Sequence, residues 1–128
     1  MIGNSIVADT NIFIDLMKGD ADVATKLESF NEVYLSPVIL VELYFGAYRS
    51  SNVEKHLSKI AVAIGKTKLL IIDAVTAEIF VTIKLALFAK GKPIPENDIW
   101  IAATSLQHQL PIYTNDEHFE EIDGIRLV

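Results

Sequence analysis

The chain has 128 residues, of which 51% are hydrophobic and 22% are charged. This length suits one domain with a single core, and an apolar content this high excludes bulk disorder. The net charge of −6 argues against a simple electrostatic binder of nucleic acid, because phosphate contacts use lysine and arginine. We therefore expect residues 1–128 to form a single domain.

Short apolar runs alternate with helical patterns in the first half of the chain. The predicted elements are a strand over 6–8, a helix over 12–17, a helix over 23–30, a strand over 33–35 and a helix over 37–48. Asp9 to Asn11 offer side chains that can cap the first helix. Ser36 offers a capping hydroxyl, and Pro37 suits the first position of the long helix that follows.

The second half continues this alternation. Its predicted elements are a helix over 53–64, a strand over 69–72, a helix over 74–89, a helix over 98–108 capped by Glu96 and Asn97, a strand over 112–114 and a candidate edge strand over 125–127. The helix over 74–89 is apolar almost all round, so the core or a second subunit must cover it. Because the strands lack alternating polar residues, the pattern predicts an α/β fold, with a single parallel sheet of four to five strands and helices on both faces.

Four acidic residues are candidates for a functional site. Asp9 and Asp116 follow predicted strands, and an open parallel sheet binds ligands at the carboxyl ends of its strands. Asp98 opens a helix, where free N–H groups and the helix dipole favour an ionised carboxylate. Glu42 interrupts an apolar helix, in which an unpaired carboxylate is costly to bury, and no basic residue lies one helical turn away.

Convergence of these acids would require a cation. Two carboxylates about 4 Å apart repel by ~4 kcal/mol at an effective dielectric near 20. The chain has no cysteine, and its three histidines are too widely spaced for a paired-histidine motif. Oxygen ligands therefore remain, and these favour Mg²⁺ or Mn²⁺ over zinc. Such an ion can lower the pKa of a water molecule and hold a phosphate oxygen, which suits hydrolysis of a phosphodiester.

Simpler structural roles remain open for several of these residues. Asp9 and Asp98 could be plain helix caps, and Asp116 could form an Asx turn. Asp15 is expected to be an ordinary surface acid. The histidines are expected at surface or packing positions, and they are His56, His108 and His118. The aromatic residues around Glu42 favour core packing or a protein interface over base stacking, and they are Tyr44, Phe45 and Tyr48.

The charge pattern and composition also constrain the cellular context. Residues 49–92 carry eight basic and three acidic side chains, whereas both flanking segments are acidic. No apolar run approaches the ~18 residues of a membrane helix, and residues 1–4 have no basic region typical of a signal or transit peptide. The lack of cysteine fits a reducing compartment. We expect a cytoplasmic protein without membrane contact.

Four segments together resemble one family. In chain order they are residues 7–16, 41–47, 91–103 and 113–119. Each segment alone is a weak signal, but their order and spacing over nearly the whole chain resemble the PIN-domain nucleases, particularly the VapC-type toxins. The resemblance implies a PIN-like fold over residues 1–128 and a Mg²⁺- or Mn²⁺-dependent endoribonuclease, the toxin of a type II toxin–antitoxin system.

The resemblance also implies roles for particular residues and partners. The family's metal ligands match Asp9, Glu42, Asp98 and Asp116, and its small polar positions near the metal and the scissile phosphate match Asn11 and Thr114. For the fourth acid, Glu117 is an alternative to Asp116. Partners would be the RNA substrate, a second copy of the chain in a homodimer, and an antitoxin whose chain lies in an apolar groove near the active site.

Other functions compete with this hypothesis. A PIN-fold module that binds RNA or a partner without catalysis would keep the fold, although the presence of all four acids disfavours it. A phosphatase of the haloacid-dehalogenase type would need a second aspartate where Asn11 stands. A phosphate-receiver domain would need an N-terminal pair of acids, which the sequence lacks.

Overall fold

The computed structural model describes residues 4–128. The prediction that residues 1–4 carry no targeting signal therefore falls mostly on residues 1–3, which lie outside the described residues. The elements are β1 (Ser5–Ala8), α1 (Thr10–Met17), α2 (Ala21–Glu28), β2 (Glu32–Leu35), α3 (Pro37–Tyr48), α4 (Val53–Gly65), β3 (Lys68–Leu69), α5 (Ala74–Lys90), α6 (Glu96–Gln107), β4 (Ile112–Tyr113) and the 3-10 helix η1 (Glu117–Glu121). No helix in this part of the chain has the length and apolarity to span a bilayer.

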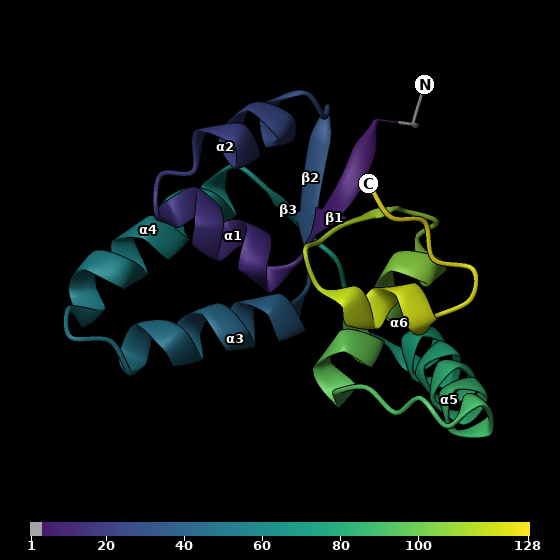
Figure 1. Ribbon diagram of the computed structural model, residues 1–128. Coiled ribbons are helices and arrows are strands. Elements are labelled where there is room, and N and C mark those ends of the chain that lie inside the picture. The colour runs from purple at the N-terminus through teal and green to yellow at the C-terminus, as the bar shows by residue number, and fades with distance from the viewer. Residues whose placement is uncertain (1–3) are drawn as a thin grey trace.

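The four strands form one parallel sheet in the order β3-β2-β1-β4. The chain moves outward from β1 through β2 to β3 and then returns to place β4 on the other side of β1. Because such crossovers are right-handed, α1 to α4 cover one face of the sheet and α5 and α6 the other, as Figure 1 shows. The predicted α/β fold is confirmed. The reversal between β1 and β4 is a topological switch point, where open parallel sheets bind their ligands.

Three predicted boundaries are wrong. The strand expected over 69–72 pairs only through Lys68–Leu69, because the chain leaves the sheet edge for α5 after Leu70 donates to the Leu35 carbonyl. The candidate strand over 125–127 is reduced to one bridge, between Ile112 and Leu127. Helix α6 begins at Glu96 rather than at residue 98, so the expected caps lie inside its first turn.

Local hydrogen bonds mark where two of the helices begin, and the predicted start of α3 is confirmed. Pro37 occupies the first turn of α3, and the Ser36 hydroxyl accepts the Ile39 N–H at 3.4 Å. Helix α5 begins with a capping box, in which Asp73 and Thr76 exchange hydrogen bonds, and ends at Gly91 in the left-handed region (φ 69°). The sequence positions of these elements therefore follow from local hydrogen bonding.

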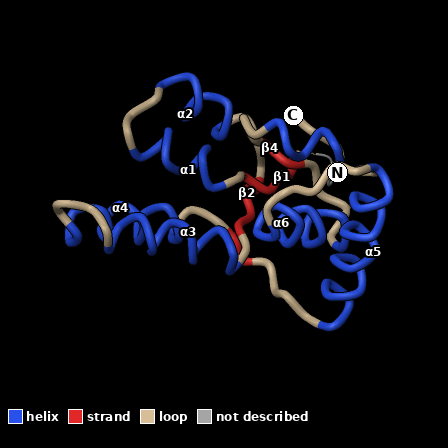
Figure 2. The backbone as a smooth tube through the Cα atoms, turned by 60° about the horizontal axis from the view of Figure 1, so that its bottom comes forward, coloured by secondary structure: helices blue, strands red, loops and turns tan. Residues whose placement is uncertain are grey.

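The core lies between the sheet and the helices that cover it. Its largest fully buried side chains include Phe13 from α1 and Phe119 from η1. On the other face, α6 lies between the strands and α5 (Figure 2), and the rings of Phe80 and Trp100 join the two helices at 4.3 Å between centroids. One side of α5 is therefore buried on α6, and its opposite side faces outward.

Candidate metal centre

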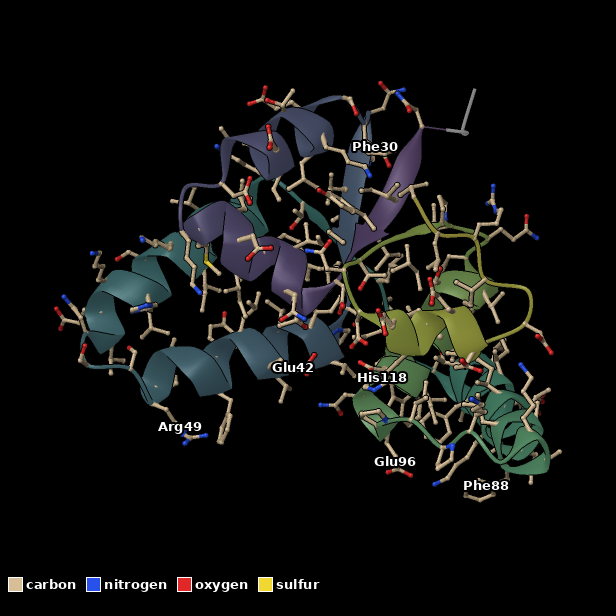
Figure 3. The ribbon with its side chains drawn as sticks, viewed as in Figure 1. Phe30, Glu42, Arg49, Phe88, Glu96 and His118 are labelled. Atoms are coloured by element: carbon tan, nitrogen blue, oxygen red, sulfur yellow. The ribbon has the colours of Figure 1, made fainter. Side chains whose placement is uncertain are left out.

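The four predicted acids meet at the carboxyl end of the sheet. Asp9 directly follows β1, and Asp116 lies just beyond β4. Glu42 lies in the second turn of α3, which follows β2, and Asp98 lies in the first turn of α6, which leads back to the start of β4. Figure 3 labels Glu42 on α3 and His118 on η1, and both are drawn below the ends of β1 and β2.

Asp9 is buried at the switch point, with 4% of its surface exposed. Its Oδ1 accepts the Thr10 N–H at 2.7 Å, so it does cap α1, and its Oδ2 accepts the Thr114 hydroxyl at 2.8 Å. Burial raises the pKa of Asp9, and the negative charges of Glu42 and Asp116 raise it further, against the lowering effect of the two hydrogen bonds. The capping interpretation is correct but incomplete, because a surface cap would not be desolvated among other acids.

Glu42 is joined to Asp9 through Thr10. The Thr10 hydroxyl donates to Glu42 Oε1 at 2.6 Å, which links the start of α1 to α3 across 32 positions of sequence. Glu42 is half-buried, so the high cost expected for a fully buried carboxylate is reduced by this contact and by water. Thr10 was expected only as a capping residue, and its position next to Asp9 was the available signal for this further contact.

Asp98 is buried, with 8% of its surface exposed, and is not a helix cap. Within residues 4–128 the first turn of α6 has no side-chain cap, and the Asp98 carboxylate instead contacts His118 Nδ1 through its Oδ2 at 2.9 Å. Burial raises the pKa of Asp98 to about 6, with further contributions from the charges of Asp116 and Asp9, while the His118 hydrogen bond acts in the opposite direction.

Asp116 and His118 form the remaining side of the centre. Asp116 caps η1, and its Oδ1 accepts the His118 N–H at 2.9 Å and lies 3.1 Å from His118 Nδ1. The Asp116 N–H in turn donates to the Thr114 hydroxyl at 2.9 Å. The expected Asx-type turn is thus present, but it holds the carboxylate within the acidic group.

His118 lies at the surface, as expected, and its side chain also reaches the acidic centre. Its ring joins Asp98 and Asp116, and one donor atom from each of the three residues lies within 4.8 Å of the others. The hydrogen bond to Asp98 raises the pKa of His118. The two-residue spacing from Asp116 at the start of a short helix was the only sequence signal for this role.

The supporting residues divide into those at the centre and those outside it. The Thr114 hydroxyl donates to Asp9 and accepts the Asp116 N–H. Asn11 is exposed on α1 and makes no hydrogen bond to the four acids within the described residues. Asp15 is half-buried and accepts a hydrogen bond from Asn115 at 3.3 Å. Glu117 is exposed, so the structure favours Asp116 over it as the fourth acid.

This arrangement fits a hard divalent cation. No lysine or arginine forms an ion pair with the four acids in the part of the chain that the structure describes. Burial is the main cause of the raised pKa values of Asp9 and Asp98, and the charges of neighbouring acids raise both further. An oxygen-rich group of this kind matches the ligand preference of Mg²⁺ and Mn²⁺.

The fold is that of a known class of protein. Residues 6–125 match the PIN domain, and the chain belongs to that family. It is 32% identical over 123 residues to the tRNA(fMet)-specific endonuclease VapC of Shigella flexneri, covering 92% of each chain. It is 29% identical over 128 residues to Ribonuclease VapC1 of Rickettsia felis, covering 96% of this chain and 94% of the relative.

A solved structure gives the same result in three dimensions. The chain superposes on the crystal structure of DNA-bound VapBC from Salmonella typhimurium with a TM-score of 0.89 and 28% identity, over 97% of this chain and 96% of that chain. The resemblance to VapC-type nucleases, first noted in four short segments, therefore extends over nearly the whole chain.

Proposed function

We propose that this chain is a VapC-type endoribonuclease, the toxin of a type II toxin–antitoxin system, and that residues 1–128 form its single nuclease domain. The observation that carries the proposal is the convergence of Asp9, Glu42, Asp98 and Asp116 at the switch point of the sheet. The two relatives described above support the substrate class, since one is named a ribonuclease and the other a tRNA-specific endonuclease.

The cofactor we propose is Mg²⁺ or Mn²⁺. Asp9, Glu42 and Asp98 would hold the ion, and Asp116 would support it or a second ion. Such an ion supplies Lewis-acid chemistry, lowering the pKa of water and stabilising charge on the scissile phosphate. The bound ion would counter the negative charge of the four carboxylates, so no lysine or arginine is needed beside them.

The chain's own residues position the reacting groups. The Thr114 hydroxyl holds Oδ2 of Asp9 at 2.8 Å, and the Thr10 hydroxyl holds Oε1 of Glu42 at 2.6 Å. These bonds restrict two carboxylates, one between β1 and α1 and one on α3, to fixed directions, so little rotamer freedom is lost when substrate binds. Asn11 is exposed beside them and is available to a phosphate oxygen of the RNA.

We propose that the chain also forms a homodimer through two apolar stripes. The stripe on α3 consists of Val41, Phe45 and Tyr48, and the stripe on α5 consists of Val81, Leu85 and Phe88. All six side chains are more than half exposed. Contiguous exposed apolar surface of this kind marks protein interfaces. In Figure 1, α3 lies at the lower left and α5 at the lower right, with the start of α6 between them.

An antitoxin is the second protein partner we propose. Support comes from the VapBC complex on which this chain superposes and from the resemblance to VapC toxins. The apolar surface next to Glu42 on α3, including Tyr44, offers such a partner contacts close to the acidic centre. Because RNA and an antitoxin both occur in the cytoplasm, we propose that the protein acts there.

The proposal is tested by incubating the purified chain with total cellular RNA in Mn²⁺, in Mg²⁺ or in EDTA. We expect discrete fragments that require the metal and that disappear in Asp98→Asn, whose side chain keeps its shape but loses its charge. A thermal melt shows that the variant is folded. Equal cleavage by the folded variant, or cleavage that is unaffected by EDTA, contradicts the proposal.

A further inference from the structure

His118 is bound to two acids of the centre by three contacts. Its Nδ1 lies 2.9 Å from Asp98 Oδ2 and 3.1 Å from Asp116 Oδ1, and its backbone N–H donates to the same Asp116 oxygen at 2.9 Å. An ionised carboxylate only accepts hydrogen bonds, so Nδ1 must carry the proton, which the two carboxylate oxygens share. The neutral ring protonated on Nδ1 and the charged ring both carry this proton, so the contact does not depend on the charge of the ring.

We propose that His118 is a positioning residue of the metal centre. Its Nδ1–H holds Oδ2 of Asp98 and Oδ1 of Asp116, and leaves Oδ1 of Asp98 and Oδ2 of Asp116 directed to a divalent cation. Within residues 4–128, no protein hydrogen bond occupies those two remaining oxygens. This inference rests on the proposed function, because it assigns a role in the same centre.

A hydrogen-bond donor between the two acids is needed because they come from different elements and repel each other. Asp98 belongs to the first turn of α6, whereas Asp116 lies in the loop before η1. Each carboxylate would otherwise turn toward solvent, since like charges about 4 Å apart repel by ~4 kcal/mol at an effective dielectric near 20. A single donor between them keeps both side chains in the orientation that a shared ion requires.

The ring of His118 is itself held in place by the fold. The backbone N–H of the same residue completes the cap of η1, and the next residue, Phe119, is fully buried in the core. The position of the ring is therefore fixed by the 3-10 helix. About half of the His118 side chain is exposed, and its Nε2 makes no hydrogen bond to any described residue. A role in which Nε2 contacts RNA is the main alternative.

Two amide substitutions separate the nitrogens of the ring. The Asn amide nitrogen is as many bonds from the backbone as His Nδ1, and the Gln amide nitrogen is as many as His Nε2. Mn²⁺ affinity is measured by calorimetry on the full chain without RNA, for wild type, His118→Ala, His118→Asn and His118→Gln. We expect His118→Ala to weaken Mn²⁺ binding by roughly 10- to 100-fold, the usual loss for groups that orient metal ligands.

The pattern of rescue then decides the role. We expect His118→Asn to recover most of the Mn²⁺ affinity and of kcat/KM for RNA cleavage, and His118→Gln to behave like His118→Ala. His108→Ala, which changes an exposed histidine at the end of α6, is the matched control and should bind Mn²⁺ like wild type. Thermal melts of all variants without metal exclude unfolding as the cause.

Three results would overturn the proposal. Unchanged Mn²⁺ affinity in His118→Ala removes the positioning role. Rescue by Gln and not by Asn assigns the function to Nε2. A much larger loss of Co²⁺ than of Mn²⁺ affinity makes His118 a ligand itself, because nitrogen donors favour Co²⁺ over Mn²⁺. Since metal binding is measured without RNA, failure of RNA cleavage and failure of this inference are distinguishable.

Discussion

The acidic centre and the two apolar stripes depart from ordinary protein surface in opposite ways. At the centre, Asp9 and Asp98 are buried as carboxylates next to other acids. On α5, Leu85 and Phe88 are 62% and 59% exposed although both are strongly apolar. Neither arrangement stabilises an isolated chain, because burying charge and exposing apolar surface are both unfavourable.

The difference teaches which kind of partner each region requires. The charge at the centre calls for a small cation, since two buried carboxylates and their neighbours have no lysine or arginine partner in residues 4–128. The stripes are exposed apolar surface, which favours contact with another apolar surface. Stability measured with and without each partner therefore distinguishes the two regions.

The largest expected effect is the loss of activity in Asp9→Asn. The change removes one negative charge and keeps the acceptor for the Thr10 N–H, so the fold is preserved. We expect RNA cleavage to fall on the order of 1,000-fold, about 4 kcal/mol in the barrier. The melting temperature without metal should stay equal or rise, because a desolvated carboxylate is gone.

Initial rates on one RNA substrate, with and without Mn²⁺, provide the measurement. Asp22→Asn, an exposed acid on α2, is the matched control and should keep wild-type rates. Wild-type cleavage by Asp9→Asn would show that charge at this position is not needed and would remove the proposed role of the centre.

The next effect concerns the stripes and the dimer. Leu85→Lys places a charge in the middle of the α5 stripe, and we expect it to weaken dimerisation by roughly 10- to 100-fold, as loss of a central interface residue does. Sedimentation across a concentration series measures the change. Val62→Lys alters an equally exposed valine on α4, outside both stripes, and should leave the dimer intact. A monomeric wild-type chain at high concentration would contradict the homodimer.

The acidic centre should also make stability depend on pH when no metal is present. The folded pKa of Asp98 is about 6, above its ordinary value of 3.8, so the folded chain holds this proton more tightly than the unfolded chain does. Stability from this group is therefore complete below about pH 4 and is lost as the pH rises through 6. The pKa of His118 is also raised, so this group too contributes stability that is lost as the pH rises.

Between pH 5 and pH 7 we expect a loss of about 1.4 kcal/mol from Asp98, one pKa unit. Urea unfolding in EDTA at both pH values measures it, and Asp98→Asn should flatten the dependence. Mn²⁺ at about 100 times its Kd should stabilise the wild type by ~2.7 kcal/mol at neutral pH. Stability that rises between pH 5 and pH 7 in wild type but not in Asp98→Asn would reverse the sign and contradict this account.

The smallest expected effect is that of Thr10→Val. Valine keeps the shape of threonine but cannot donate to Glu42, so this carboxylate loses its fixed direction. We expect kcat to fall by about 10-fold and the free energy of unfolding by no more than ~1 kcal/mol. Thr82→Val, which removes a hydroxyl that bonds only its own helix, is the control. Activity equal to wild type would make the Thr10 contact incidental.

Much of the fold was predictable because its signals are local. Ser36 and Pro37 begin α3 where expected, since a capping hydroxyl and a fixed φ act on the next turn alone. The run over 69–72 was misjudged, because apolar content does not tell a buried central strand from a short edge strand with Leu69 and Ile71 exposed. Glu96 was taken for a cap, although it opens α6 and pairs with Lys84.

The sequence by itself determined the alternation of strands and helices. It also singled out the four acids, two by their places after strands, Asp98 by its place at the start of a helix and Glu42 by its place within an apolar helix. Only the tertiary structure decided which side chains join them. The Thr114 hydroxyl reaches Asp9 across 105 positions, and the His118 ring reaches Asp98 across 20. Such contacts depend on β4 returning to pair with β1. Hydrophobic periodicity and capping residues depend on residues about one helical turn away in the sequence. The pairing of β4 with β1 depends instead on how the whole chain folds.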